Sequence, residues 1–239
     1  MKDLKKKKKL HDGRTKKLYS LEESDQLVQE FKDDAVGFEA SSSEPIKGKG
    51  IINKEISCFL FHYLEGFHIP THFIKDLGGR EMLVRRLEMI PIEVAIRNIV
   101  AGSLTQRFGL EAGKELSYPI IEFYLKDEQR GNPMINPSHA IALLLVTLEE
   151  IQTIERLTSK INAVLKSFFQ RRNFRLVDLA LEFGRSKDKL VLGDEISLNT
   201  FRLSPHNPVV ETHPSDFQLV QPANELDLEE LKKRIFQPA

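Results

Sequence analysis

The stretch 176-LVDLALEFG-184 alternates apolar side chains with Asp178, Ala180 and Glu182. A repeat of two residues predicts a β-strand, because successive side chains of a strand point to opposite faces. One face is then apolar, and the other carries both acids. The repeat of two residues follows a repeat of helical spacing in the preceding segment of the chain.

A second strand is expected to return beside the first. Residues 184–189 have the composition of a turn, and Leu190–Leu192 begins an apolar run that leads into Asp194 and Glu195. The sequence therefore predicts a hairpin that carries four carboxylates.

Four carboxylates on one hairpin suggest two kinds of surface. Asp178, Glu182 and one of Asp194 or Glu195 on a single face would suit Mg²⁺, which takes one or two carboxylates together with substrate phosphates. Which of the last two faces inward depends on the register of the hairpin. The alternative is a solvated polar face of an antiparallel sheet, and the pattern alone favours it.

The elements before this hairpin are mixed. Strands are expected at Lys17–Ser20, Leu27–Lys32, Met82–Arg86 and Glu93–Asn98, with Pro91 ruling out a continuous helix between the last two. A helical repeat runs from Gly50 to about Gly66. We expect a boundary between two lobes near the proline.

The clearest helix begins at Thr147, which has capping-box spacing with Glu150. Its apolar positions recur every three or four residues and predict a buried stripe rather than a cofactor site. The stripe consists of Ile151, Ile154, Leu157, Ile161, Val164, Leu165 and Phe168.

Composition excludes several classes of protein. The 239 residues are 41% hydrophobic, which is enough for a sizeable core, and 35 basic residues balance 35 acidic ones. Zero net charge argues against a surface built to hold nucleic acid. The single cysteine, Cys58, cannot form an internal disulfide, and no apolar run reaches the ~20 residues of a membrane span. We expect a cytoplasmic protein that binds neither nucleic acid nor membrane.

The lysine run 5–9 predicts a solvated basic leader. Contact with nucleic acid is the alternative function of this run, and it would weaken steeply with salt.

Three stretches offer cations beside small residues. Gly13–Lys17 and Lys47–Gly50 could surround phosphates with backbone N–H groups and charge, although each is a weak signal alone. The third, Arg97–Ser103, joins a guanidinium to an amide and a hydroxyl, and arginine suits bidentate contact with carboxylate or phosphate.

Short motifs follow one another in a characteristic order along the chain: Gly13–Tyr19, Phe31–Asp34, Lys49–Asn53, Gly66–His72, Met89–Asn98, Ala101–Ser103, Arg107–Gly109, Glu122–Lys126, Leu176–Asp178, Leu181–Gly184, Leu192–Ser197 and Arg202–Leu203. Taken together, they resemble the phosphoribosylaminoimidazole-succinocarboxamide synthase (SAICAR synthetase) family over about residues 10–203.

The resemblance implies an α+β fold of two lobes, with ATP in the cleft. We expect a basic leader over 1–9, a small antiparallel-sheet N-terminal lobe over 10–86 that covers ATP, and a larger α+β C-terminal lobe over 87–239 with the substrate and metal site. The implied reaction joins L-aspartate to carboxyaminoimidazole ribotide at the expense of ATP, through an acyl phosphate. A homodimer is common among chains that resemble this one.

Site residues follow from the matched positions. The resemblance implies catalytic roles for Lys16, Asp178, Glu182 and Asp194, with the exact role of Asp178 left open. It implies nucleotide contacts from Gly13, Arg14, Lys16, Lys126, Glu182 and Asp194, and Mg²⁺ contacts from Glu182 and Asp194. It implies substrate contacts from Arg97, Ser103, Asn199 and Arg202.

The chain departs from the family pattern at three charged positions. Ala180 stands where the family usually has lysine, and Asn132 and Asn199 stand where it usually has aspartate. Each Asp-to-Asn change removes a charge. The segment after Leu203 also differs. These departures leave a second hypothesis beside the synthase, namely a relative that binds nucleotide or ribotide but has lost or altered catalysis.

Overall fold

The computed structural model describes residues 6–22, 25–33, 45–187, 189–206, 217–220, 222 and 224–237. Contacts within the chain divide it into two units. The first comprises Met1–Glu88, Gly184–Asn199 and Pro222–Phe236, and the second comprises Met89–Phe183, Thr200–Gln221 and Gln237–Ala239. The boundary after Glu88 lies two residues beyond the one expected from sequence. Segments 184–199 and 222–236, which we had expected in the C-terminal lobe, pack with the N-terminal part.

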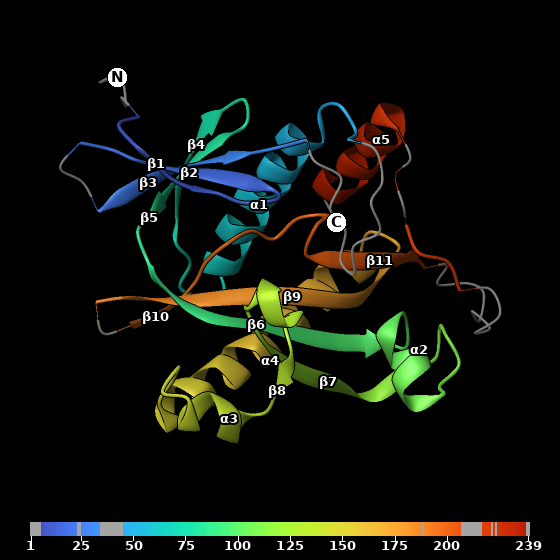
Figure 1. Cartoon of the computed structure of the whole chain (residues 1–239). Helices are drawn as coiled ribbons and strands as arrows, with labels where there is room; N and C mark the ends of the chain where they lie inside the picture. The colour runs from blue at the N-terminus through green and yellow to red at the C-terminus, as the bar shows by residue number, and fades with distance from the viewer. Residues whose placement is uncertain are drawn as a thin grey trace. The chain divides into compact units, whose positions relative to one another are not determined.

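The first unit is built on a five-stranded sheet with the order β1-β2-β3-β5-β4 (Figure 1). Neighbouring strands pair antiparallel. The strands are β1 (Lys9–Asp12), β2 (Lys16–Ser20), β3 (Gln26–Phe31), β4 (Phe73–Gly78) and β5 (Glu81–Arg85). The predicted strands at 17–20, 27–32 and 82–86 are confirmed within one residue.

The basic leader is more ordered than expected where it is described. Residues 1–5 lie outside the described part of the chain, but Lys7 N donates to Ser20 O at 2.9 Å, and Lys6 Nζ lies 2.5 Å from Glu30 and from Glu81. Lys9 begins β1. Part of the run is therefore bound to the sheet, because acidic residues on β3 and β5 attract it.

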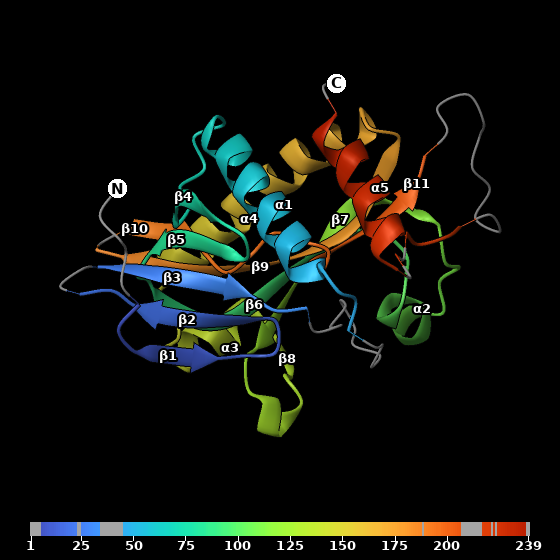
Figure 2. The same ribbon diagram turned by 90° about the horizontal axis from the view of Figure 1, so that it is seen from above.

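Helix α1 (Lys49–Glu65) packs on strands β3, β4 and β5, and α5 (Glu225–Phe236) packs beside α1 (Figure 2). Ile52, Ile56, Leu60 and Leu64 are buried, which confirms the predicted apolar face.

The first turn of α1 is tied to the sheet through Asp33. Asp33 Oδ1 accepts from Gly50 N at 2.8 Å, and the two carboxylate oxygens accept from Arg80 at 2.5 and 2.6 Å. The Arg80 hydrogen bonds hold the pKa of Asp33 below its usual value. A Cβ on Gly50 would lie 2.7 Å from the carbonyl oxygen of Lys32, so the close approach requires glycine.

A six-stranded sheet runs β10-β9-β6-β7-β8, with β11 paired to β9. Its strands are β6 (Glu88–Ile99), β7 (Glu115–Leu125), β8 (Met134–Ile135), β9 (Phe174–Ser186), β10 (Lys189–Leu192) and β11 (Phe201–Pro205). The predicted hairpin of β9 and β10 is confirmed, although Asp188 of its turn lies outside the described residues.

No helix passes through Pro91, as expected, but the strand expected to begin at Glu93 begins at Glu88, so β6 runs through the proline. Its carbonyl accepts from Lys126 N at 3.0 Å, and its missing N–H costs nothing where the residue is exposed. The break falls instead at residues 86 and 87, between β5 and β6.

Helices α2 (Ser103–Phe108), α3 (Pro137–Ala142) and α4 (Leu148–Gln170) complete the second unit, with a 3₁₀ turn at Glu128–Arg130. Thr147 and Glu150 form the predicted capping box of α4. The predicted stripe is buried except at Val164, which is partly exposed. None of the described helices is both long and apolar enough to cross a membrane.

Candidate functional site

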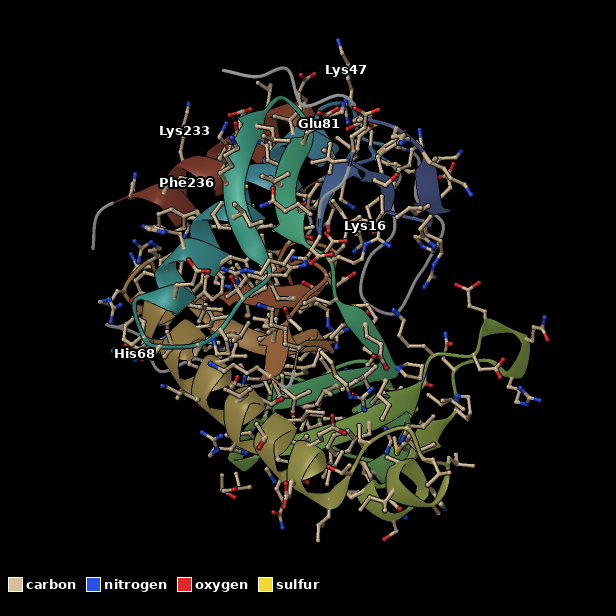
Figure 3. All side chains as sticks on the ribbon, turned by 90° about the vertical axis from the view of Figure 1, so that its left-hand side faces the viewer. Lys16, Lys47, His68, Glu81, Lys233 and Phe236 are labelled. Atoms are coloured by element: carbon tan, nitrogen blue, oxygen red, sulfur yellow. The ribbon has the colours of Figure 1, made fainter. Side chains whose placement is uncertain are left out.

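In the first unit, Lys16 lies against two carboxylates. Its Nζ is 2.6 Å from Asp194 Oδ1 and 2.7 Å from Glu195 Oε1. Lys16 begins β2, and its side chain is labelled in Figure 3. We call these three residues the lysine cluster. Both acids that follow β10 therefore face the same cation, whereas the hairpin pattern had left a choice between them.

The two consecutive acids converge because the backbone of Asp194 is left-handed, with φ of 60°. In an extended strand they would point to opposite faces. This turn in the backbone cannot be read from the alternation of side chains.

Glu195 is the more deeply buried acid, with 1% of its side chain exposed. Thr15 Oγ1 donates to its Oε1 at 2.8 Å, Ser197 Oγ donates to its Oε2, and Asn199 Nδ2 lies 3.3 Å from Oε2. Lys49 is also buried, and burial lowers its pKa although the charge of Glu195 opposes that shift. A buried carboxylate with this many donors is well compensated.

The turn before β2 holds Gly13 and Arg14. Gly13 N donates to Lys16 O at 2.9 Å, and Lys32 Nζ donates to Gly13 O at 2.7 Å. Arg14 is exposed. The turn is fixed by backbone contacts and leaves a guanidinium at the surface.

In the second unit, Asp178 is held between two arginines. Arg97 Nη1 donates to its Oδ2 at 3.2 Å, and Arg202 donates through Nε to its Oδ1 at 2.9 Å and through Nη2 to its Oδ2. Asp178 is completely buried. We call these residues the arginine cluster, and its core is an ion network rather than the solvated face that the pattern alone favoured.

Glu122 extends the arginine cluster. It accepts from Arg97 Nε at 3.1 Å, from Arg107 Nη1 at 2.7 Å and from the Tyr124 hydroxyl at 2.9 Å. Burial acts to raise the pKa of Glu122, but the bonds from Arg107 and Tyr124 and the charge of Arg97 outweigh it and the pKa falls below its usual value. Burial also raises the pKa of Tyr124.

Glu182 has a cation of its own in the second unit. Both carboxylate oxygens of Glu182 lie 2.5 Å from Lys126 Nζ. The side chain of Glu182 is 12% exposed and that of Lys126 is 44% exposed. Ser103 begins α2 directly after Gly102, whose φ is 55°.

The predicted residues thus fall into three groups. Lys16, Asp194 and Asn199 meet around Glu195 in the first unit, with Gly13 and Arg14 in the adjoining turn. Arg97, Asp178 and Arg202 meet in the second unit, where Lys126 pairs with Glu182. Asn199, which we had grouped with the substrate arginines, contacts Glu195 instead.

Several residues of these clusters were not singled out from the sequence as site residues. In the first unit, Glu195 contacts the predicted Lys16, and Thr15 and Ser197 donate to Glu195. In the second unit, Glu122 accepts from the predicted Arg97, and Tyr124 donates to Glu122. Glu195 was one of the two alternatives of the hairpin. Glu122 was visible only as part of a family motif.

The described residues hold no group of three or more His, Cys, Asp or Glu side chains arranged to bind a metal ion. The described residues therefore contain no metal site of which all the ligands are side chains of this kind. Mg²⁺ needs only one or two carboxylates when phosphates supply the rest. Asp194, at 17% exposure, and Glu182, at 12%, suit that kind of binding.

Comparison with protein-family models gives a match over most of the chain. The model described as SAICAR synthetase matches residues 9–218.

Curated relatives are similar in sequence to this protein over most of the chain. The phosphoribosylaminoimidazole-succinocarboxamide synthase of Chloroherpeton thalassium is 47% identical over 200 residues, which are 84% of this chain and 85% of the relative. The synthase of the same name from Chlorobium limicola is 48% identical over 193 residues, which are 81% of this chain and 82% of the relative.

Solved structures share the fold. A type-2 SAICAR synthetase in complex with ADP has a TM-score of 0.85 and 36% identity, and the match covers 96% of this chain and 99% of the other. The synthase from Ehrlichia chaffeensis has a TM-score of 0.86 and 32% identity, with 95% and 98% coverage. The α+β fold expected from the sequence is confirmed.

Proposed function

Because the chain belongs to the SAICAR synthetase family, we propose that it is an ATP-dependent ligase that joins L-aspartate to carboxyaminoimidazole ribotide in de novo purine synthesis. The observation that carries this proposal is the match to named synthases over more than four fifths of the chain. The same match favours the synthase over a relative that only binds nucleotide.

The proposed reaction has two steps. A carboxylate oxygen of the ribotide attacks the γ-phosphorus of ATP, and the bond from that phosphorus to the bridging oxygen breaks to release ADP. The amine of aspartate then attacks the acyl carbon, the new C–N bond replaces the C–O bond to phosphate, and the amine loses its proton. The products are SAICAR, ADP and phosphate.

The lysine cluster is assigned to the nucleotide. Lys16 would pair with the phosphates, which carry negative charge that increases toward the transition state. Gly13 and Arg14, in the turn just before Lys16, would add a backbone contact and a second cation. Support comes from the position of Lys16, which is held against carboxylates in a partly buried place.

Asp194 and Glu182 would each offer a carboxylate to Mg²⁺, and the type of donor suits this ion. When bound, Mg²⁺ neutralises phosphate charge and orients the transferred group. Lys126, paired with Glu182, would keep that carboxylate oriented and would contact the nucleotide. Each of these carboxylates already lies against the ammonium group of a lysine.

The arginine cluster is assigned to the ribotide. Arg97 and Arg202 present guanidinium groups suited to carboxylate and phosphate, and Ser103 adds a hydroxyl donor. Asp178 fixes the orientation of both arginines, which supports a positioning role for this acid among the catalytic residues. Asn199, whose side chain contacts Glu195, would bind the substrate.

The three departures from the family pattern are proposed to be compatible with activity. Asn199 donates to Glu195, so an aspartate there would place two carboxylates together. Asn132 is exposed in a turn and has a left-handed backbone with φ of 49°, which asparagine tolerates well. Ala180 is buried in β9, between Asp178 and Glu182.

A direct assay tests the proposal. Purified protein is incubated with carboxyaminoimidazole ribotide, L-aspartate and Mg-ATP, and ADP release and the mass of the product are followed. We expect turnover that requires both aspartate and Mg²⁺. Binding of ATP without product in the complete mixture would contradict the ligase assignment.

Two broader statements belong to the same proposal. We place the enzyme in the cytoplasm, and we propose a homodimer, which light scattering after gel filtration tests directly. A monomeric mass at working concentration would refute the dimer and would leave the ligase assignment intact.

A further inference from the structure

The left-handed backbone of Asp194 is an uncommon conformation for a residue with a side chain. Such a conformation persists only where neighbouring groups hold it in place. Here it lets two consecutive carboxylates reach Lys16, at 2.6 and 2.7 Å. The groups that hold this backbone therefore control the geometry of the lysine cluster.

Gln29 is one of these groups. Its Nε2 donates to the carbonyl oxygen of Asp194 at 3.1 Å, across 165 residues of sequence. Gln29 lies in the middle of β3, where it pairs with Leu18 on one side and Met82 on the other, and it is 2% exposed. A buried amide between two apolar neighbours costs free energy unless it is hydrogen-bonded, so this bond is the reason the site tolerates glutamine.

The register of the sheet puts Gln29 on the same face as Lys16. Leu18 is opposite Gln29 and Lys16 is opposite Phe31, and residues two apart on one strand share a face. One face of β2 and β3 therefore presents both the cation and the amide to the segment that carries Asp194 and Glu195.

The segment before Asp194 is anchored as well. His72 N donates to Leu192 O at 2.9 Å, and the side chain of His72 is buried. Leu192 is thus fixed on one side of the left-handed residue, while Gln29 binds the carbonyl of that residue itself.

We propose that Gln29 is a positioning residue, whose amide holds the backbone of Asp194 so that the carboxylates of Asp194 and Glu195 face Lys16 ready for the magnesium nucleotide. Gln29 touches neither substrate nor metal in this scheme and acts through Asp194. The inference rests on the nucleotide role proposed for the lysine cluster.

A double-mutant cycle with Gln29→Met and Asp194→Ala tests the inference, with the Kd of Mg-ADP measured by calorimetry in all four proteins. Methionine keeps the length of the side chain but has no amide. We expect Gln29→Met to weaken Mg-ADP binding about tenfold, the size of one hydrogen bond, and to have a smaller effect once Asp194 is alanine, because only Glu195 then remains to be positioned. A packing defect would instead lower the melting temperature and act equally in both backgrounds.

The matched control is Gln26→Met, at the first position of the same strand and on its other face. Its Kd for Mg-ADP should equal that of the wild type. If Gln29→Met does not fold, Gln29→Asn replaces it in the cycle, because it keeps the amide but shortens it beyond reach of Asp194.

The outcomes separate the two proposals. If Asp194→Ala leaves Mg-ADP binding unchanged, the nucleotide role of Asp194 is wrong and the positioning role falls with it. If Asp194→Ala weakens binding but Gln29→Met has no effect, or has the same effect in both backgrounds, only the positioning role of Gln29 is overturned.

Discussion

The guanidinium of Arg97 and the carboxylate of Asp178 form a buried ion pair, with 3.2 Å between Arg97 Nη1 and Asp178 Oδ2 and side-chain exposures of 4% and 0%. Charges this deep are stable only as partners, because removal of one leaves the other without compensation in a medium of low polarity. The pair lies at the centre of the contacts that join β6, β9 and β11.

Asp178→Asn should lower the free energy of unfolding by about 3 kcal/mol, because two arginines lose their shared anion. Urea unfolding followed by circular dichroism measures the change. Asp127→Asn is the control, since in the Asp127–Arg130 pair Asp127 is 21% and Arg130 is 72% exposed, and ion pairs that solvent reaches contribute little. Equal stabilities of the two variants would contradict the prediction.

Lys16→Met should lower kcat/KM for Mg-ATP by about a hundredfold or more, because it deletes a cation assigned to the phosphates. ADP release at varied ATP concentration measures the effect. Lys17→Met changes the next residue of β2, which faces the other side of the strand near Glu30, and should retain near-normal kinetics. A similar loss of kcat/KM in both variants would mean that ATP responds to the total positive charge of the strand rather than to the lysine cluster.

Asn199→Asp should weaken Mg-ADP binding and lower the melting temperature by several degrees, because a donor to Glu195 becomes a second carboxylate. Calorimetry and thermal unfolding at pH 7 report the two effects. Asn132→Asp is the matched control, since that position is exposed in a turn, and it should leave both quantities unchanged. Tighter nucleotide binding by Asn199→Asp would show that the site lacks an acid here.

Cys58 should react slowly with thiol reagents in the folded protein. Burial raises the pKa of its thiol from 9.0 to about 12, so the reactive thiolate is scarce at pH 8. Since it is the single cysteine of the chain, the rate of labelling with a chromogenic disulfide reports this site alone. Labelling as fast in buffer as in concentrated urea would refute the prediction.

The same pKa shift predicts how stability changes with pH. Above pH 9 the unfolded thiol loses its proton while the folded thiol keeps it, so the free energy of unfolding should fall between pH 9 and about 12, by up to about 1.4 kcal/mol per pH unit. Below pH 9 the effect is absent. Urea unfolding at pH 8 and pH 10.5 measures the fall, and Cys58→Ala should remove this part of it.

Local patterns were sufficient to predict the main elements. The repeat of Ile151 to Phe168 with the Thr147 capping box predicted α4, and the alternation around Asp178 predicted β9, because both signals arise between residues a few positions apart. The start of β6 was placed at Glu93 rather than Glu88, because the tolerance of a strand for Pro91 depends on the neighbouring strand and on the exposure of the proline. Family membership also followed from ordered motifs alone.

The partners of the site residues depended on the tertiary structure. Thr15 and Glu195 are in contact across 180 residues, and Gln29 and Asp194 across 165, so no local period connects them. Asp194 and Glu195 both face Lys16 because the backbone of Asp194 is left-handed, and the alternation of side chains cannot encode that conformation. The sequence by itself thus determined the elements and the family, whereas long-range packing decided which acid meets which cation, because those contacts form only when distant segments are brought together by the fold.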